Sequence, residues 1–391
     1  MYLYYFLAAL ACWFGLQSLL SGIRFAAYMC RETNRAIPDY QPFVSVIAPG
    51  RGVEPGLADN LRPLLMQEYP RYEVLFVFDA ADDPAVQVVE QISGGFSRMA
   101  RTIIAGPATD SGQKVHNLRV AVTHIDAKSE VLVFVDTDAR PAKNWLAQLV
   151  APLADETLGA SSGYRWFVPV RGSFASRLRG VWNASIASAL GADTTKNFCW
   201  GGSTAIHRAT FERLGVSERW RGTVSDDFTI TRVLKEANLP VHFTPNCLVP
   251  SVGDCDLHEL FEFTTRQVKI TRVYASHLWL PLLLGSALFV IAFFGGLILI
   301  GFHPRSFAVY VFPLVIFTLG AAKSFIRFRA VSSVVRTSRS DLAAHIFLWP
   351  IASLLYLYNC IVAGFSRRIS WRGITYELKS PNEAVIISRD S

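Results

Sequence analysis

The chain has 391 residues, of which 51% are hydrophobic and only 18% are charged, and its formal net charge is +7. This composition excludes an ordinary soluble protein of the same length, because too little polar surface remains to cover the apolar part. Most of the Asp and Glu residues lie between about Pro42 and Arg272, whereas both ends carry long uncharged runs. The sequence therefore predicts a soluble domain between membrane segments.

The first apolar run extends from Leu3 to Leu20 and continues with little polarity to Ala27. It is long enough to cross about 30 Å of hydrocarbon. A cleaved signal peptide is the alternative, but no basic segment precedes the run and the run is longer than such signals usually are. We therefore predict a transmembrane helix within residues 1–28.

Strands and helices then alternate within residues 42–275. Apolar β-branched runs ended by turns indicate the strands. The predicted elements are strands at 43–49, 73–78, 101–105 and 131–135, and helices at 56–67, 85–92 and 114–123. Their order predicts a doubly wound α/β domain, in which ligands bind beyond the carboxyl ends of the strands.

Two carboxylates follow the last of these strands directly. Asp136 and Asp138 flank Thr137, so on an extended strand end their side chains point the same way. Such a pair can hold one divalent cation, Mg²⁺ or Mn²⁺, or a pyrophosphate bound through it. The pattern alone is weak, and its position after a buried strand is what favours a functional role.

Charged side chains also follow the second strand and begin a later helix. Asp79 or Asp82 is placed to accept hydrogen bonds from a base or a ribose hydroxyl. Asp83, which precedes Pro84, is better explained as a helix N-cap. Lys114 could bring positive charge to bound phosphates, although a lone lysine is more often a surface charge.

The segment Trp200, Gly201 and Gly202 combines small residues with an aromatic one. It would let the backbone approach a ligand beside an aromatic face, although packing explains the glycines equally well.

Further on, Asp226 and Asp227 open a helix predicted at 228–237. Because two adjacent carboxylates cannot both face inward, we expect one to be a general base with a raised pKa. Helix capping is the alternative for this segment.

Arg266, Lys269 and Arg272 recur at three-residue spacing on a predicted helix and form one basic face. That face could neutralise a leaving diphosphate or lie at the membrane surface. The net charge also allows two interpretations. It fits contact with anionic lipid and phosphate-bearing ligands, and it fits a simple positive-inside bias equally well. The six cysteines show no CxxC spacing, which argues against a zinc site or a disulfide framework.

Three further apolar segments, at 278–302, 307–322 and 343–365, predict C-terminal membrane elements within residues 276–366. The basic residues between the last two, and those after the first helix, favour a cytoplasmic position for the soluble domain. Four crossings would leave the basic tail, residues 367–391, on the opposite side, so the topology stays open. The last segment contains Pro350 and is the best candidate for a re-entrant or interfacial element.

Taken in order, a set of motifs resembles the ceramide glucosyltransferase family and its relatives within glycosyltransferase families 2 and 21. The motifs are Val44-Ser-Val-Ile, Glu73-Val-Leu-Phe, Asp82-Asp-Pro, Lys114-Val-His-Asn-Leu, Asp136-Thr-Asp, Ser225-Asp-Asp-Phe and Arg266-Gln-Val-Lys. The resemblance covers residues 43–274. It implies a GT-A fold, a nucleotide-diphosphate sugar that is usually UDP-linked, a divalent cation, and inversion at the anomeric carbon.

The resemblance also implies roles for single residues. Asp82 looks like the first acidic motif, Asp136 the second, and Asp227 the third, which is the general base. The family pattern (Q/R)xxRW falls on Arg266 and Lys269.

The sequence departs from this pattern at two positions, since Lys269 stands for the Arg and Ile270 for the Trp. A lysine keeps the charge but lacks the bidentate grip of arginine. The acceptor therefore stays open among ceramide-like lipids, diacylglycerol, phospholipid head groups and polyisoprenoid-type lipids.

We predict an inverting hexosyltransferase that moves glucose or a related sugar from a UDP-sugar to a lipid hydroxyl. Asp227 is the expected base, the donor contacts are Asp79, Asp82, Lys114, Asp136, Arg266 and Lys269, the metal ligands are Asp136 and Asp138, and the acceptor side is Trp200, Gly201 and Gly202. We expect a multi-pass protein of a bacterial inner membrane, with the lipid bilayer and no nucleic acid among its partners. A processive polysaccharide synthase and a catalytically silent membrane scaffold are the alternatives.

Overall fold

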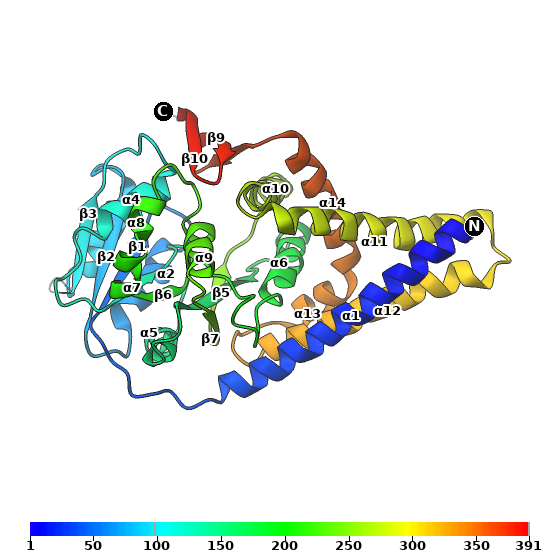
Figure 1. Cartoon of the computed structure of the whole chain (residues 1–391), viewed down its shortest axis with the longest axis horizontal. Helices are drawn as coiled ribbons and strands as arrows, with labels where there is room; N and C mark the ends of the chain where they lie inside the picture. The colour runs from blue at the N-terminus through cyan, green and yellow to red at the C-terminus, as the bar shows by residue number, and fades with distance from the viewer. Residues whose placement is uncertain (97–98, 390–391) are drawn as a thin grey trace. The chain divides into compact units, whose positions relative to one another are not determined.

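The computed structural model describes residues 1–96 and 99–389 (Figure 1). The chain forms two compact units. The helical unit comprises Met1–Arg31, Phe167–Ala189 and Asp254–Ser366, and the sheet unit comprises Glu32–Trp166, Leu190–Gly253 and Arg367–Ser391. Asp390 and Ser391, the end of the predicted tail, lie outside the described residues.

These units differ from the boundaries proposed from the sequence, because 167–189 and 254–275 group with the helical unit. Aromatic packing explains the grouping of these two segments. Trp182 stacks on Tyr356 with 4.7 Å between ring centroids and meets Phe263 edge-on at 6.0 Å.

The sheet unit contains a seven-stranded sheet in the order β3-β2-β1-β4-β6-β5-β7. The strands are β1 Val44–Pro49, β2 Tyr72–Phe78, β3 Ala100–Ile104, β4 Val131–Phe134, β5 Ala160–Val168, β6 Thr204–His207 and β7 Val241–Val252. β1 pairs in parallel with β2 and β4, whereas β4 pairs antiparallel with β6. The four predicted strands are therefore present and parallel, and the complete sheet is mixed.

Register brings the carboxyl ends of the parallel strands to one edge. Val44 lies beside both Tyr72 and Val131, so β1, β2 and β4 begin at the same position along the strand direction. All six residues of β1 and all four of β4 are buried, as expected for strands covered on both faces. The residues that follow Phe78 and Phe134 consequently emerge at the same edge.

Short helices accompany this sheet. They are α2 Leu57–Leu61, η1 Arg62–Met66, α3 Pro84–Ser93, α4 Gln113–Ala121, α5 Trp145–Val150, η2 Ala151–Ala154, α7 Arg208–Arg213, α8 Val216–Arg219 and α9 Asp226–Glu236. The predicted helix at 56–67 is split into α2 and the 3₁₀ helix η1. Pro63 near the start of η1 lacks the amide hydrogen that an α-helix would need there.

The helical unit consists of α1 Tyr2–Thr33, α6 Phe174–Ala187, α10 Leu257–Tyr274, α11 Ser276–Phe302, α12 Phe307–Val331, α13 Arg339–Phe347 and α14 Trp349–Phe365. In the described part of the chain, α1, α11 and α12 are long and apolar enough to cross a membrane. The pair α13 and α14 passes the same test but bends by 59° at its break. The break falls at Leu348, two residues before Pro350, in the segment that the sequence singled out.

α12 is longer than the predicted apolar segment 307–322, and the basic residues expected after that segment continue the helix. Lys323 Nζ donates a hydrogen bond to Ser18 Oγ at 2.7 Å, and Arg327 donates to Ser188 Oγ at 3.5 Å. Because polar partners are available within the unit, the helix does not have to end where the charges begin.

The predicted tail folds as a three-stranded antiparallel sheet in the order β10-β9-β8, with β8 Arg368–Trp371, β9 Ile374–Ser380 and β10 Glu383–Arg389. Alternate residues of β9, namely Ile374, Tyr376 and Leu378, are at most 2% exposed. Val385 and Ile387 of β10 are 39% and 46% exposed. The sheet therefore buries one face and leaves the other open.

Candidate active site

Asp136 and Asp138 lie immediately after β4, at the carboxyl edge of the sheet. Lys114 Nζ lies 2.7 Å from Asp136 Oδ1, and Arg165 of β5 reaches Asp136 Oδ2 at 3.1 Å and Asp138 Oδ2 at 3.4 Å. Burial opposes ionisation here, yet Lys114 and Arg165 hold the pKa of Asp136 below its ordinary value. Asp136 is therefore ionised and contacts two cations, and Arg165 links it to Asp138.

Lys114 connects this pair to the start of α9. Its amine also lies 3.1 Å from Asp226 Oδ1, and its side chain is only 15% exposed. Burial favours the neutral amine, but Asp136, Asp226 and Asp227 together raise the pKa of Lys114 above its ordinary value. The lone lysine of the sequence is therefore a largely buried cation at the centre of the site, not a surface charge.

The two adjacent carboxylates of α9 have different surroundings. Ser225 is the N-cap and accepts a hydrogen bond from Phe228 N at 3.4 Å. Asp227 Oδ1 accepts hydrogen bonds from Phe228 N at 2.7 Å and from the Ser225 hydroxyl, and its side chain is half-buried. Asp226 is 2% exposed.

Asp226 is the carboxylate whose pKa is raised. Burial raises it to about 6, with Asp227 and Asp136 adding to the effect and Lys114 opposing it. The raised pKa that the sequence led us to expect at a general base therefore falls on the residue beside Asp227. We call Asp136, Asp138, Asp226 and Asp227, together with Lys114 and Arg165, the acidic cluster.

Gly201 and Gly202 lie against this cluster. A Cβ atom on Gly201 would stand 2.7 Å from Lys114 Nζ and would also clash with Asp226, and one on Gly202 would stand 2.8 Å from Asp136 Oδ2. The guanidinium of Arg165 lies over the Trp200 ring, 4.9 Å from its centroid. All three predicted acceptor-side residues thus contact the acidic cluster, and the absence of side chains at the glycines leaves room for its charges.

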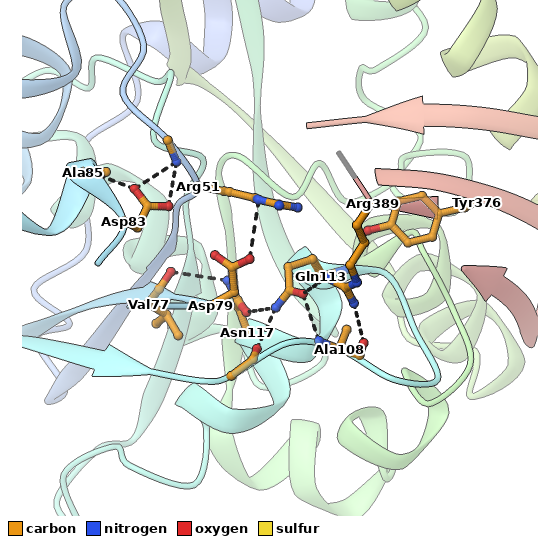
Figure 2. Close-up of polar contacts among 12 residues, drawn as sticks. Arg51, Val77, Asp79, Asp83, Ala85, Ala108, Gln113, Asn117, Tyr376 and Arg389 are labelled. Atoms are coloured by element: carbon orange, nitrogen blue, oxygen red, sulfur yellow. Dashed lines mark hydrogen bonds and ion pairs between the residues drawn. The ribbon is translucent and has the colours of Figure 1, made fainter. Parts of the chain in front are cut away.

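A second group of polar side chains lies beyond β1 and β2 (Figure 2). Arg51 Nε lies 3.4 Å from Asp79 Oδ2. Asp83 is the N-cap of α3, as the sequence predicted, and also accepts a hydrogen bond from Gly52 N at 2.8 Å. Asp82 is exposed in the turn between β2 and α3. Asp79 is thus better placed than Asp82 at the strand end.

Figure 2 also shows a set of hydrogen bonds centred on Gln113, the first residue of α4. Its amide nitrogen donates to Asn117 Oδ1 at 2.8 Å, and its amide oxygen accepts from Ala108 N at 2.9 Å and Arg389 Nη1 at 3.3 Å. Its backbone N–H donates to Tyr376 Oη at 3.1 Å. We call these five residues the Gln113 network.

Arg266 and Lys269 belong to α10 of the helical unit. Arg266 pairs with Glu262 at 3.2 Å, one helical turn away, and Lys269 Nζ donates to Ser366 Oγ at 3.4 Å. Burial lowers the pKa of Lys269. Their predicted role at a diphosphate stays a prediction.

Sequence reasoning missed Arg165 of the acidic cluster, and it also missed Arg51, Glu54 and Arg372 of the sheet unit. Arg165 stands within β5, between the buried residues Tyr164 and Trp166. An arginine amid such an apolar strand is the signal that was available, because a charge there needs a partner.

The carboxylates of the acidic cluster fit a divalent cation. Asp138 Oδ1 is buried and has no hydrogen-bond partner among the described residues. In the same part of the chain, no group of three or more His, Cys, Asp and Glu side chains is arranged to hold a metal ion. Two carboxylates that share a cation with substrate phosphate oxygens are, however, the arrangement typical of Mg²⁺ sites.

An acidic pair at the carboxyl edge of an α/β sheet, in a chain that also contains long apolar helices, is the arrangement expected of a GT-A glycosyltransferase. The protein-family model of glycosyl transferase family 21 matches residues 3–384. The chain therefore belongs to glycosyltransferase family 21. The predicted resemblance and the predicted fold class, a GT-A-type α/β domain with added apolar helices, are confirmed.

Two curated relatives are ceramide glucosyltransferases. Ceramide glucosyltransferase 3 of Caenorhabditis elegans is 31% identical over 81 residues, which cover 20% of this chain and 18% of the relative. Ceramide glucosyltransferase of Candida albicans is 25% identical over 123 residues, which cover 28% and 22%. The matched part thus spans about a fifth of each relative's length.

Among solved structures, similarity extends to a mannosyltransferase from Pyrobaculum calidifontis in complex with GDP-Man and Mn²⁺, with a TM-score of 0.49 and 19% identity over 92% of this chain and 99% of that one. Glucosyl-3-phosphoglycerate synthase from Mycobacterium tuberculosis has a TM-score of 0.37 and 13% identity, over 63% of this chain and 80% of that one.

Proposed function

We propose that the protein transfers a hexose, glucose or a related sugar, from a UDP-sugar to a hydroxyl group of a membrane lipid, with inversion at the anomeric carbon. The observation that carries the proposal is the acidic cluster, in which Lys114 joins Asp136 to Asp226 while Asp227 stands half-buried beside them. Family membership supports the reaction class, and the ceramide glucosyltransferases among the relatives support a lipid acceptor.

In this proposal Asp227 is the general base. In the described part of the chain both of its hydrogen bonds are accepted by Oδ1, which leaves Oδ2 to take a proton from the acceptor hydroxyl. The hydroxyl oxygen then attacks C1 of the sugar from the face opposite the diphosphate. Asp226 holds Lys114 in place and is a positioning residue.

Lys114 and Arg165 stabilise the charge that develops on the departing diphosphate. Both side chains are largely shielded from solvent, at 15% and 14% exposed, so their electrostatic effect is stronger than it would be in water. A divalent cation on Asp136 and Asp138, Mg²⁺ or Mn²⁺, would supply Lewis-acid stabilisation of the same leaving group. Asp79 and Arg51, beyond β1 and β2, are proposed to meet the nucleoside.

The membrane setting rests on α1, α11 and α12, each long and apolar enough to span a bilayer. We propose that the sheet unit faces the cytoplasm, because Arg24 and Arg31 follow the first apolar run and basic residues continue through the end of α12. The bacterial inner membrane and the number of crossings stay predictions of the sequence.

The experiment is to supply membranes containing the protein with a panel of radiolabelled UDP-sugars and to measure label in the extracted lipid. The proposal predicts labelled lipid carrying a single sugar with wild-type membranes and none with Asp227→Asn. Polymeric product would support a processive synthase instead. No label with any donor, from protein that is folded and still binds lipid, would support the silent scaffold.

A further inference from the structure

The C-terminal sheet contacts the two sides of the proposed donor site. Through Tyr376 and Arg389 it enters the Gln113 network, and Arg389 also donates to the carbonyl of Ala108 (Figure 2). Through Arg372, in the turn between β8 and β9, it forms an ion pair with Glu54, in the loop that follows β1. The sheet is thus attached to both loops that border the strand ends.

Arg372 and its partner lie at the same edge of the sheet as the acidic cluster. Glu54 belongs to the loop that follows β1, and Gln113, which is bonded to Tyr376 of the C-terminal sheet, directly precedes Lys114. Arg372 is 39% exposed and Glu54 31% exposed, so the pair is open to a ligand that enters from solvent. Arg372 is therefore a further cation at this edge of the sheet, paired with Glu54.

The backbone at Arg372 is unusual. Its φ is 53° and that of Gly373 is 70°, which makes a two-residue hairpin turn of the kind that asparagine and glycine favour. A left-handed conformation costs an arginine about 1 kcal/mol or more. An asparagine would fit the turn better, so the guanidinium group, not the turn, explains the residue at this position.

The charge balance near the strand ends gives this guanidinium a role. The carboxylates there outnumber the cations, and a bound diphosphate adds further negative charge. The carboxylates are Glu54, Asp79, Asp136, Asp138, Asp226 and Asp227, and the cations are Arg51, Lys114, Arg165 and Arg372. An arginine held by a partly exposed carboxylate can exchange that partner for phosphate oxygens, to which its planar group binds in bidentate fashion.

We propose that the C-terminal sheet is part of the donor site and that Arg372 is a ligand of the donor diphosphate, held in readiness by Glu54. This inference rests on the proposed function, since it assumes a nucleoside diphosphate-sugar donor. It assigns a binding role to a segment that lies after all the motifs quoted in the sequence analysis, the last of which ends at Lys269. Tyr376 and Arg389 are the residues that keep the sheet in position.

The test compares binding of UDP and of uridine to the purified full-length chain in detergent at a fixed Mg²⁺ concentration. Arg372→Asn removes the guanidinium but preserves the left-handed turn, so the sheet should still dock. We expect UDP binding to weaken by about 10- to 100-fold and uridine binding to stay unchanged, because only UDP carries the diphosphate. Arg372→Lys should fall between wild type and Arg372→Asn.

Lys379→Ala is the matched control, since Lys379 lies on β9 and pairs with Glu377 of the same strand. It removes one positive charge from the same sheet and should leave both ligands bound as in wild type. A merely structural role for Arg372 predicts that UDP and uridine weaken together, and that result, or unchanged UDP binding by Arg372→Asn, overturns the inference alone. If wild type binds no nucleoside diphosphate among UDP, GDP, ADP and CDP, the proposed function fails and the inference with it.

Discussion

The acidic cluster and the Gln113 network hold their side chains in place by different means. In the acidic cluster, the partly buried Asp136 and Asp138 and the buried Asp226 share two cations at distances of 2.7 to 3.4 Å. In the Gln113 network, neutral amide groups carry most of the hydrogen bonds, and Arg389 is the only charged member.

The two arrangements respond differently to the loss of one partner. Removing a member of a buried ion pair leaves an uncompensated charge and costs about 3–5 kcal/mol, whereas losing one neutral hydrogen bond costs about 1 kcal/mol. Changes in the acidic cluster should therefore stop the reaction or alter its pH dependence. Changes in the Gln113 network should only loosen the loops around the donor.

The largest effect is expected from Asp227→Asn. The amide cannot accept the proton of the acceptor hydroxyl, so kcat should fall by about 10²- to 10⁴-fold with little change in donor KM. Steady-state kinetics with saturating lipid would measure this. Asp256→Asn, which changes the N-cap carboxylate of α10, is the control and should retain kcat. A loss of less than tenfold in Asp227→Asn would remove this residue from the role of base.

A second prediction concerns Asp226, whose pKa of about 6 in the folded protein exceeds that of an unfolded aspartate, about 3.9. Since the folded state binds this proton more tightly, ionisation of Asp226 destabilises the fold as the pH rises from about 4 through 6. Asp226→Asn cannot ionise. Its free energy of unfolding, relative to wild type, should improve by roughly 3 kcal/mol between pH 4 and pH 7.

Thermal unfolding in detergent across that pH range would measure the difference. Asp138→Asn changes a carboxylate of the same cluster that is outside the Lys114–Asp226 ion pair, and it should not reproduce the trend. If the difference in free energy of unfolding between wild type and Asp226→Asn stays constant with pH, Asp226 is ionised throughout the range and acts only as an ion-pair partner of Lys114.

The smallest effect is expected from Tyr376→Phe in the Gln113 network. The change removes the hydroxyl that accepts the hydrogen bond of Gln113 N and should cost about 1–2 kcal/mol of stability. Hydrogen exchange in residues 105–112 should accelerate, because this loop loses part of its anchor. Tyr310→Phe makes the same chemical change in the helical unit and should leave that loop unaffected. Unchanged exchange in Tyr376→Phe would mean that the C-terminal sheet does not hold the loop.

Local patterns were enough to predict the parallel half of the sheet and its caps. The strand cores of β1, β2 and β4 are continuous apolar runs, and Asp83 and Ser225 precede their helices as N-caps should. These features depend on short segments and on the connections between them. The contact between Lys114 and Asp136 was not predicted, because a single lysine at the start of a helix gives no sign of its partner.

Features that depend on distant pairing could not be predicted from the sequence. Arg165 reaches the acidic pair because β5 and β6 add to the sheet in antiparallel fashion, which no local pattern encodes. The strands β8 to β10 are short and rich in charge, so the sequence indicated only a basic tail. Their apolar residues form one face only when the three strands pair with one another. The contact of Arg372 with Glu54 could not be predicted for the same reason.

The measurement that tests the central claim most directly is the anomeric configuration of the lipid-linked sugar, read from proton couplings in the NMR spectrum of the product. Single displacement at the acidic cluster, with Asp227 as base, predicts a β-glycoside from UDP-α-D-glucose or the corresponding inverted product from another donor. An α-glycoside would show that configuration is retained and would contradict the assignment of Asp227 as the base of a single displacement.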